Sequence, residues 1–166
     1  MDDEDFHPGM IKRLDTGFEG RLERHYPHDP AAVWAMLTEP QHLPKWLAPG
    51  TIELRQGGAV RIDFADSGVV IDSTVSVMTP LQTLEYSWSS GQQPKRPLRW
   101  DLHPESDGTR LTLTVRLPAG EDAAKACAGF EGHLAMLAAA LEDVPVRFPL
   151  ELYLQARKHY QALLDA

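Results

Sequence analysis

Residues 98–117, LRWDLHPESDGTRLTLTVRL, decide the fold of this chain. Every second residue is apolar in residues 98–102 and again in residues 111–117, and the turn sequence SDG at residues 106–108 separates the two runs. Such alternation predicts strands with one apolar and one polar face, and the short turn predicts that they pair antiparallel. A sheet of this kind packs on one side only, so it needs an apolar partner elsewhere in the chain.

The same alternation occurs in three segments upstream. Residues 60–64, 69–77 and 84–88 repeat the pattern, so five strands share one design, and residues 20–26 can form a further strand. The acidic residues of the alternating strands fall on the polar face, where we expect them to be solvated rather than to form a catalytic pair: Asp63, Asp72, Glu85 and Asp101.

An alanine-rich segment, residues 121–143, supplies the partner for the sheet. Its apolar residues lie on one helical stripe, which consists of Phe130, Leu134, Leu137 and Leu141. Two prolines then separate it from a last amphipathic helix over residues 151–164. We therefore predict an α+β protein in which a curved antiparallel sheet wraps around a long C-terminal helix, with two short helices after the first strand.

Composition restricts the classes of partner. The chain has 166 residues, of which 43% are hydrophobic, and we expect one domain over residues 17–166 after a mobile acidic tail at residues 1–16. A net charge of -8 without a Lys/Arg-rich run argues against nucleic acid. No apolar stretch approaches the roughly 20 residues of a membrane span, and the first residues are acidic, so we expect a cytoplasmic protein without integral membrane association. The single cysteine, Cys127, is expected to be an apolar filler.

Several short sequences resemble a known family. They are PAAVWAMLTEP at residues 30–40, HLPKW at 42–46, the Gly57-Gly58 pair, GTRLTL at 108–113 and Gly129-Phe130. Together with the order of elements they resemble the family of activator-of-heat-shock-protein-90 ATPase homologues, within the SRPBCC superfamily of START-like and birch-pollen-allergen-like proteins. The resemblance covers nearly all of the chain from about residue 20.

This resemblance implies a helix-grip fold and a hollow interior that binds small hydrophobic molecules. Family members commonly carry Trp where this chain has Phe130, a departure expected to alter the wall of the interior. A role with the chaperone belongs to eukaryotic members that have an additional N-terminal domain, which this chain is not expected to contain. The shared motifs mark turns and core positions rather than chemical groups, so they indicate fold more strongly than function.

The sequence shows no established catalytic or metal-binding pattern. There is no Gly-Xaa-Ser-Xaa-Gly motif, no phosphate-binding loop and no dinucleotide fingerprint, so no cofactor is predicted. His25 and His28 lack further ligands at metal-binding spacing and are expected to be solvated turn residues. His133 lies three residues after Phe130 on the flank of the helix stripe, where it is either a polar group of the interior or an ordinary histidine of the helix surface or the hydrogen-bonded core.

Aromatic residues of inward parity are the remaining candidates for a binding site. Tyr86, Trp88 and Trp100 are each expected either to line a pocket or to pack in the core, and the sequence favours neither role. Trp46 lies at a Pro-rich bend that could border an entrance. The predicted ligand-binding residues are Trp46, Phe64, Ile71, Ser73, Tyr86, Trp88, Trp100, Phe130, His133, Leu134 and Leu137.

Three functions are compatible with these features. The first is binding of a small, largely hydrophobic molecule, such as a lipid or an aromatic metabolite, between sheet and helix. The second is an enzyme similar to the cyclases and dehydratases of the same superfamily, with His133 and Tyr86 as acid and base, which is disfavoured because no catalytic pair stands out. The third is a protein-interaction module, either as a homodimer or as a co-chaperone-like protein.

Overall fold

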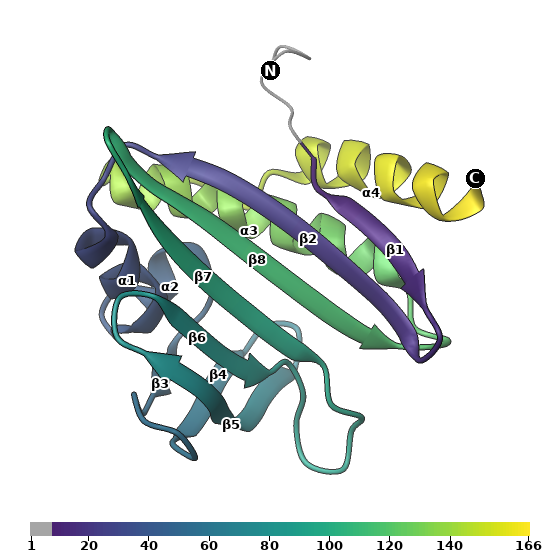
Figure 1. Ribbon diagram of the computed structural model, residues 1–166, viewed down its shortest axis with the longest axis horizontal. Coiled ribbons are helices and arrows are strands. Elements are labelled where there is room, and N and C mark those ends of the chain that lie inside the picture. The colour runs from purple at the N-terminus through teal and green to yellow at the C-terminus, as the bar shows by residue number, and fades with distance from the viewer. Residues whose placement is uncertain (1–7) are drawn as a thin grey trace.

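The computed structural model describes residues 8–166 and shows a large antiparallel sheet with helices on one side of it (Figure 1). Its strands are β1 (Met10–Leu14), β2 (Gly17–Tyr26), β3 (Gly50–Ile52), β4 (Ala59–Phe64), β5 (Val69–Thr79), β6 (Thr83–Ser87), β7 (Pro97–Glu105) and β8 (Gly108–Pro118). Its helices are α1 (Pro30–Thr38), α2 (Leu43–Trp46), α3 (Ala123–Leu141) and α4 (Leu150–Asp165).

The strands form one sheet in the order β1-β2-β8-β7-β6-β5-β4-β3. Residues 98–117 lie in the hairpin of β7 and β8, whose strands pair along their length, with Trp100 opposite Leu113. Residues of one parity are buried in both strands, as the alternation predicts. The predicted α+β helix-grip class is therefore confirmed.

Helix α3 lies across the concave face of the sheet, and its buried residues complete the core (Figure 1). The predicted stripe is confirmed for Phe130, Leu134 and Leu137, which are almost fully buried. Asp122 caps the helix, because its side chain accepts a hydrogen bond from the Lys125 amide at 3.0 Å. Helices α1 and α2 follow β2 and contact α3, so they cover the part of the concave face that α3 leaves.

The predicted tail is wrong for part of its length. Residues 1–7 lie outside the described residues, but Met10–Leu14 form β1, which pairs with β2 and is contacted by α4. Ile11 is buried in the core, and this one apolar contact is too short a pattern to be recognised as a strand in the sequence. The predicted last helix, in contrast, is confirmed as α4.

A buried carboxylate joins these terminal elements. Glu131 on α3 is fully buried and accepts a hydrogen bond from the Tyr160 hydroxyl of α4 at 2.6 Å. It also accepts a bond from the Gly9 amide at 3.0 Å and forms an ion pair with Arg24 of β2. Because these partners satisfy its oxygens, Glu131 ties α3 to α4, to β2 and to the start of β1.

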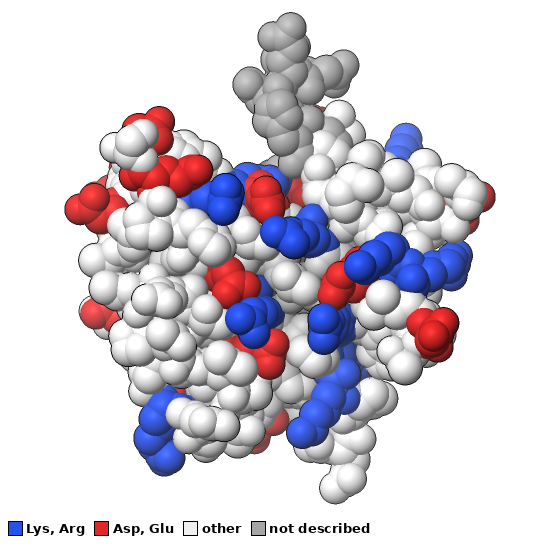
Figure 2. Space-filling view, in the orientation of Figure 1, with Lys and Arg blue, Asp and Glu red and all other residues white. Residues whose placement is uncertain are grey.

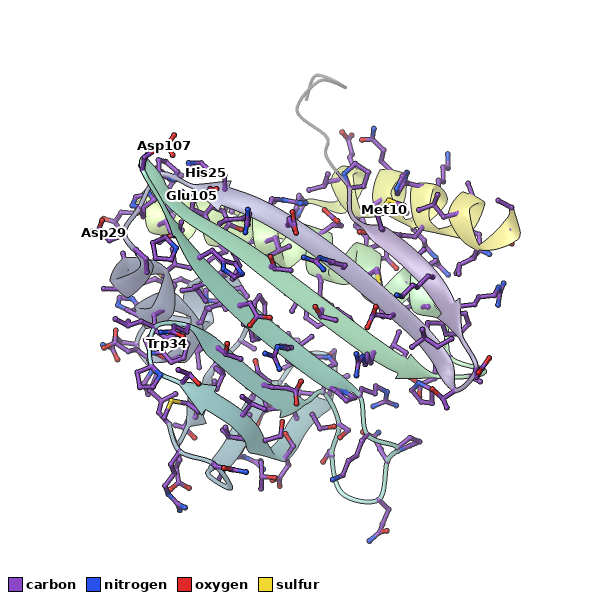
Figure 3. All side chains as sticks on the ribbon, in the orientation of Figure 1. Met10, His25, Asp29, Trp34, Glu105 and Asp107 are labelled. Carbon is purple, nitrogen blue, oxygen red and sulfur yellow. The ribbon has the colours of Figure 1, made fainter. Side chains whose placement is uncertain are left out.

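The convex face of the sheet is polar and balanced in charge. Figure 2 shows Lys and Arg interspersed with Asp and Glu over this face. Arg116 pairs with Glu19 at 3.0 Å across β8 and β2, and Arg99 bonds to Asp101 at 3.0 Å within β7. At one end of the sheet His25 contacts Glu105 at 2.8 Å, beside Asp107 in the β7–β8 turn (Figure 3). The predicted solvated face is thus built from paired charges.

None of the helices within residues 8–166 is long and apolar enough to cross a membrane.

Candidate functional site: an aromatic pocket at one end of α3

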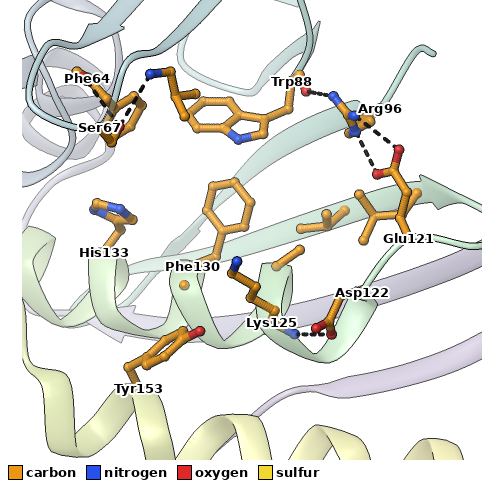
Figure 4. A pocket seen from close by; sticks show the side chains of 15 residues that line it. Phe64, Ser67, Trp88, Arg96, Glu121, Asp122, Lys125, Phe130, His133 and Tyr153 are labelled. Atoms are coloured by element: carbon orange, nitrogen blue, oxygen red, sulfur yellow. Dashed lines mark hydrogen bonds and ion pairs between the residues drawn. The ribbon is translucent and has the colours of Figure 1, made fainter. Parts of the chain in front are cut away.

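A pocket of about 640 Å³ opens between the first half of α3 and the β4–β5 hairpin. Strand β8 forms its floor with Val115 and Leu117, and Tyr153 of α4 borders its side (Figure 4). Its lining is mostly apolar, and the complete set is Phe64, Ser67, Val69, Trp88, Arg96, Val115, Leu117, Glu121, Asp122, Lys125, Ala126, Gly129, Phe130, His133 and Tyr153. The volume lies within the range of about 300 to 1,000 Å³ that is typical of small-molecule sites.

Three aromatic rings form the wall of the pocket. Trp88 lies in the middle, with its ring centroid 5.3 Å from that of Phe130 and 5.9 Å from that of Phe64, both in edge-to-face geometry. Phe64 comes from the end of β4, Trp88 follows β6 and Phe130 comes from α3, so three distant segments meet here. Such contacts hold the rings in fixed orientations, and their faces and edges can receive another planar apolar group.

His133 provides a polar group at the inner end of this wall. In Figure 4 its imidazole rises from α3 toward Phe64, beside the ring of Phe130. Its Nδ1 lies 2.9 Å from the carbonyl oxygen of Trp46, and its ring centroid is 5.3 Å from that of Phe148. Burial lowers the pKa of His133 below its ordinary value, and the bond to the Trp46 carbonyl opposes this only in part. This lowering of the pKa favours the neutral imidazole at pH 7.

Charged side chains at the mouth are largely paired with one another. Arg96 forms a bidentate ion pair with Glu121, with nitrogen–oxygen distances of 2.7 and 3.0 Å, and it donates to the Trp88 carbonyl at 3.1 Å. This pair links the β6–β7 loop to the segment before α3. Asp122 pairs with Arg157 of α4 at 3.1 Å. Lys125 is exposed at the rim, and no ion pair involves it within residues 8–166.

A second hollow of about 530 Å³ adjoins the first on the side of the β5 strand. The two share Val69, Trp88, Leu117 and Ala126 as well as the Arg96–Glu121 ion pair, so they are neighbouring parts of one depression. Ile71 borders this second part, which is more polar than the first.

The structure brings together only some of the residues predicted to bind a ligand. Phe64, Trp88, Phe130 and His133 border the aromatic pocket, and Ile71 borders the second hollow. The remaining predicted residues border neither: Trp46, Ser73, Tyr86, Trp100, Leu134 and Leu137. Whether a ligand touches any of them stays a prediction.

Packing explains why these residues lie away from the pocket. Trp46 and Trp100 are fully buried against each other, with centroids 5.6 Å apart, and Trp46 donates to the Met36 carbonyl at 2.7 Å. Tyr86 is almost fully buried in the same core, and burial raises its pKa. The part of the concave face beneath α1 and α2 is thus filled by side chains. The Ser73 hydroxyl donates a hydrogen bond to the Ser87 carbonyl at 2.7 Å and so links β5 to β6.

Sequence reasoning missed several residues of the pocket. Arg96 and Glu121 lie in loops without periodicity, so nothing in the sequence indicates that they pair. Gly129 stands out in the sequence only as part of a family motif. In the structure it borders the pocket, and a Cβ atom added to it would meet nothing within 4 Å, so the missing side chain contributes to the hollow. No group of three or more potential metal ligands occurs among the described residues.

The sequence matches the family model described as Activator of Hsp90 ATPase homolog 1-like protein over residues 27–142. The chain belongs to this family. The matched region runs from the end of β2 to the end of α3, so it includes every helix and strand that borders the aromatic pocket except α4. Folds of this type commonly bind hydrophobic ligands. No curated protein matches the chain significantly.

Solved structures of similar proteins support the same fold for this family member. CalU16 from Micromonospora echinospora superposes with a TM-score of 0.79 at 18% identity, covering 95% of this chain and 98% of CalU16. The protein encoded by BPP1335 of Bordetella parapertussis has a TM-score of 0.71 at 26% identity over 90% of this chain and 87% of its own. DynU16, from the dynemicin biosynthetic locus, has a TM-score of 0.71 at 28% identity over 78% of this chain but 49% of its own.

Proposed function

We propose that this protein binds a small, largely apolar molecule in the aromatic pocket between α3 and the β4–β5 hairpin. The observation that carries the proposal is the wall formed by Phe64, Trp88 and Phe130 over the apolar floor of β8. Rings that are fixed by their own packing offer apolar contact area at little cost in conformational entropy. Folds of this type commonly bind hydrophobic ligands, which supports the proposal.

The pocket suits a ligand that leaves one end near solvent. Most of its lining is apolar or aromatic, whereas the lining residues Ser67, Asp122 and Lys125 are exposed. Transfer of apolar surface from water into such a site contributes about 25 cal/mol per Å² before the costs of association. Contact area along the wall would therefore provide most of the affinity.

The alternative of an enzyme with His133 and Tyr86 as acid and base has no support from the geometry. His133 borders the pocket, but Tyr86 is buried next to Trp88 in the filled core and borders neither hollow. A bound molecule in the pocket would meet only one of the two groups. The homodimer and co-chaperone alternatives stay predictions.

Titration of tryptophan fluorescence with uncharged polycyclic aromatic probes and with fatty alcohols tests the proposal. Trp88 is a partly exposed pocket residue, whereas Trp46 and Trp100 are fully buried, so the saturable change is expected to disappear in Trp88→Phe. Because Trp88→Phe lacks the fluorescence signal, its affinity for the same probes is measured by isothermal titration calorimetry.

A blocking variant provides the decisive control. Gly129→Phe places a ring in the pocket from a position where a Cβ atom meets nothing, so the fold is expected to persist while binding is lost. Leu154→Phe adds an aromatic ring on the exposed side of α4, away from both hollows, and is expected to bind like the parent protein. Undiminished binding by folded Gly129→Phe would show that the ligand lies elsewhere.

A further inference from the structure

The hydrogen bond of His133 fixes which of its nitrogens carries the proton. A backbone carbonyl can only accept, so the bond between Nδ1 and the Trp46 oxygen at 2.9 Å requires a proton on Nδ1. In the neutral ring Nε2 then has a free lone pair and can only accept. His133 therefore presents an acceptor and no donor at its second nitrogen.

This acceptor is accessible and unpaired within the described part of the chain. Every buried side-chain nitrogen or oxygen there has a hydrogen-bond partner, and none is found for Nε2, so Nε2 is not fully buried, and His133 lines the aromatic pocket. The neighbouring rings are Phe64, at a centroid distance of 6.1 Å, and Phe148. A ligand that displaces water from Nε2 has to replace the lost hydrogen bond, because aromatic carbons cannot do so.

The charges at the mouth favour a ligand without net charge. Both guanidinium nitrogens of Arg96 that face Glu121 are occupied by its carboxylate, and Asp122 is held by Arg157. Anion recognition by Arg96 would require that this ion pair be broken. Lys125 is the remaining cation among the described lining residues, and it lies exposed at the rim, where an ionic contact contributes little.

Resting on the proposed function, we infer that His133 selects uncharged aromatic molecules that carry a hydroxyl group, which donates a hydrogen bond to Nε2 while the ring packs on the wall of Phe64, Trp88 and Phe130. A ligand with an ether or carbonyl oxygen at the same place would set two lone pairs against each other, so His133 also disfavours it. His133 thus determines specificity, whereas the aromatic wall supplies contact area.

A matched pair of probes tests this assignment. 2-Naphthol and 2-methoxynaphthalene share a ring system, but the ether lacks a donor and is the more apolar of the two, so the hydrophobic effect alone favours the ether. We expect 2-naphthol to bind about 3- to 10-fold more tightly by isothermal titration calorimetry at pH 7, as one neutral hydrogen bond provides. Equal affinity, or tighter binding of the ether, would overturn the assignment.

Two variants locate the effect at Nε2. His133→Asn keeps an N–H near the position of Nδ1 for the Trp46 carbonyl but has no acceptor at the position of Nε2, and His133→Phe removes both. The preference for 2-naphthol is expected to fall below about 2-fold in each, with circular dichroism confirming the fold and with the affinity for 2-methoxynaphthalene retained. A preference that survives in folded His133→Asn would refute the role of Nε2.

The remaining outcomes separate this inference from the proposed function. Tighter binding of 2-naphthoate than of 2-naphthol would refute it and assign the polar contact to Lys125. If the two uncharged probes bind equally and Gly129→Phe abolishes both, the pocket is a binding site but His133 does not select the ligand. If neither probe binds to the parent protein, the proposed function fails and this inference fails with it.

Discussion

Two glycines of α3 are expected to respond in opposite ways to the same added methyl group. A glycine inside a helix is less stable than alanine by about 0.5 to 1 kcal/mol, because its backbone loses more entropy on folding. A Cβ atom on Gly129 would have nothing within 4 Å, so Gly129→Ala should gain this amount in full. At Gly132 the same atom would lie 2.5 and 2.6 Å from two carbons of the Phe148 ring.

Gly132→Ala must therefore displace Phe148. That ring is 38% exposed and packs against His133 and Tyr153, so it can move, but the move disturbs these contacts. We expect the disturbance to cancel the gain in helix propensity or to exceed it by up to about 1 kcal/mol.

Urea denaturation followed by circular dichroism measures both variants. Gly129→Ala should raise the free energy of unfolding by about 0.5 to 1 kcal/mol and the melting temperature by about 1 to 4 °C, with an unchanged denaturant slope. Gly132→Ala should leave both quantities unchanged or lower them. If Gly129→Ala is not stabilising, or if Gly132→Ala stabilises equally, the assignment of open space at one glycine and contact at the other is wrong.

Four further outcomes are expected from buried and paired groups elsewhere in the protein. Glu131→Ala should lower the free energy of unfolding by about 3 to 5 kcal/mol, because the buried Tyr160 hydroxyl loses its acceptor and the ion pair with Arg24 is broken, and Tyr160→Phe should cost about 1 to 3 kcal/mol in the same denaturation assay. The hydrogen bond to Glu105 raises the pKa of His25, so its stabilising effect is present below pH 6.5 and is lost as the pH rises through the raised pKa; an NMR titration should show this pKa falling in Glu105→Gln. Burial raises the pKa of Cys127 to about 12, so a thiol reagent at pH 8 should label it only after unfolding, and rapid labelling of the folded protein would contradict its burial.

Periodicity was sufficient to predict the long strands of the sheet and the helix that packs on it, but it predicted neither β1 nor the three-residue strand β3. Alternation needs only local sequence, and a strand that is buried on one face must alternate wherever it lies in the sheet. Strand β1 was not predicted because Ile11 is its single buried residue. Gly9, just before the strand, is held in place by a hydrogen bond from its amide to Glu131, which is distant in the sequence. Such a contact leaves no local pattern.

The candidate site was predictable only in part, because inward parity does not tell how deep a side chain lies. Trp88 and Trp100 both fall on the concave side of the sheet, yet Trp100 packs against Trp46 of α2, whereas Trp88 stands beyond the end of β6. What separates them is the position of α1 and α2 over the sheet, which depends on contacts between distant segments. The pairing of Arg96 with Glu121 depends on the same kind of information.

The pocket does not carry the free-energy cost of an empty cavity, because it is open to water. A sealed, dry void of 640 Å³ would cost about 15 kcal/mol at roughly 24 cal/mol per Å³, which is as much as the whole stability of a domain. The exposed residues Ser67, Asp122 and Lys125 at the rim show that water can enter, so the free protein does not bear this cost. A ligand is then not needed for folding. Its binding should add stability only by mass action, about 2.7 kcal/mol at a free concentration 100 times the dissociation constant, and a protein that unfolds without ligand would contradict this account.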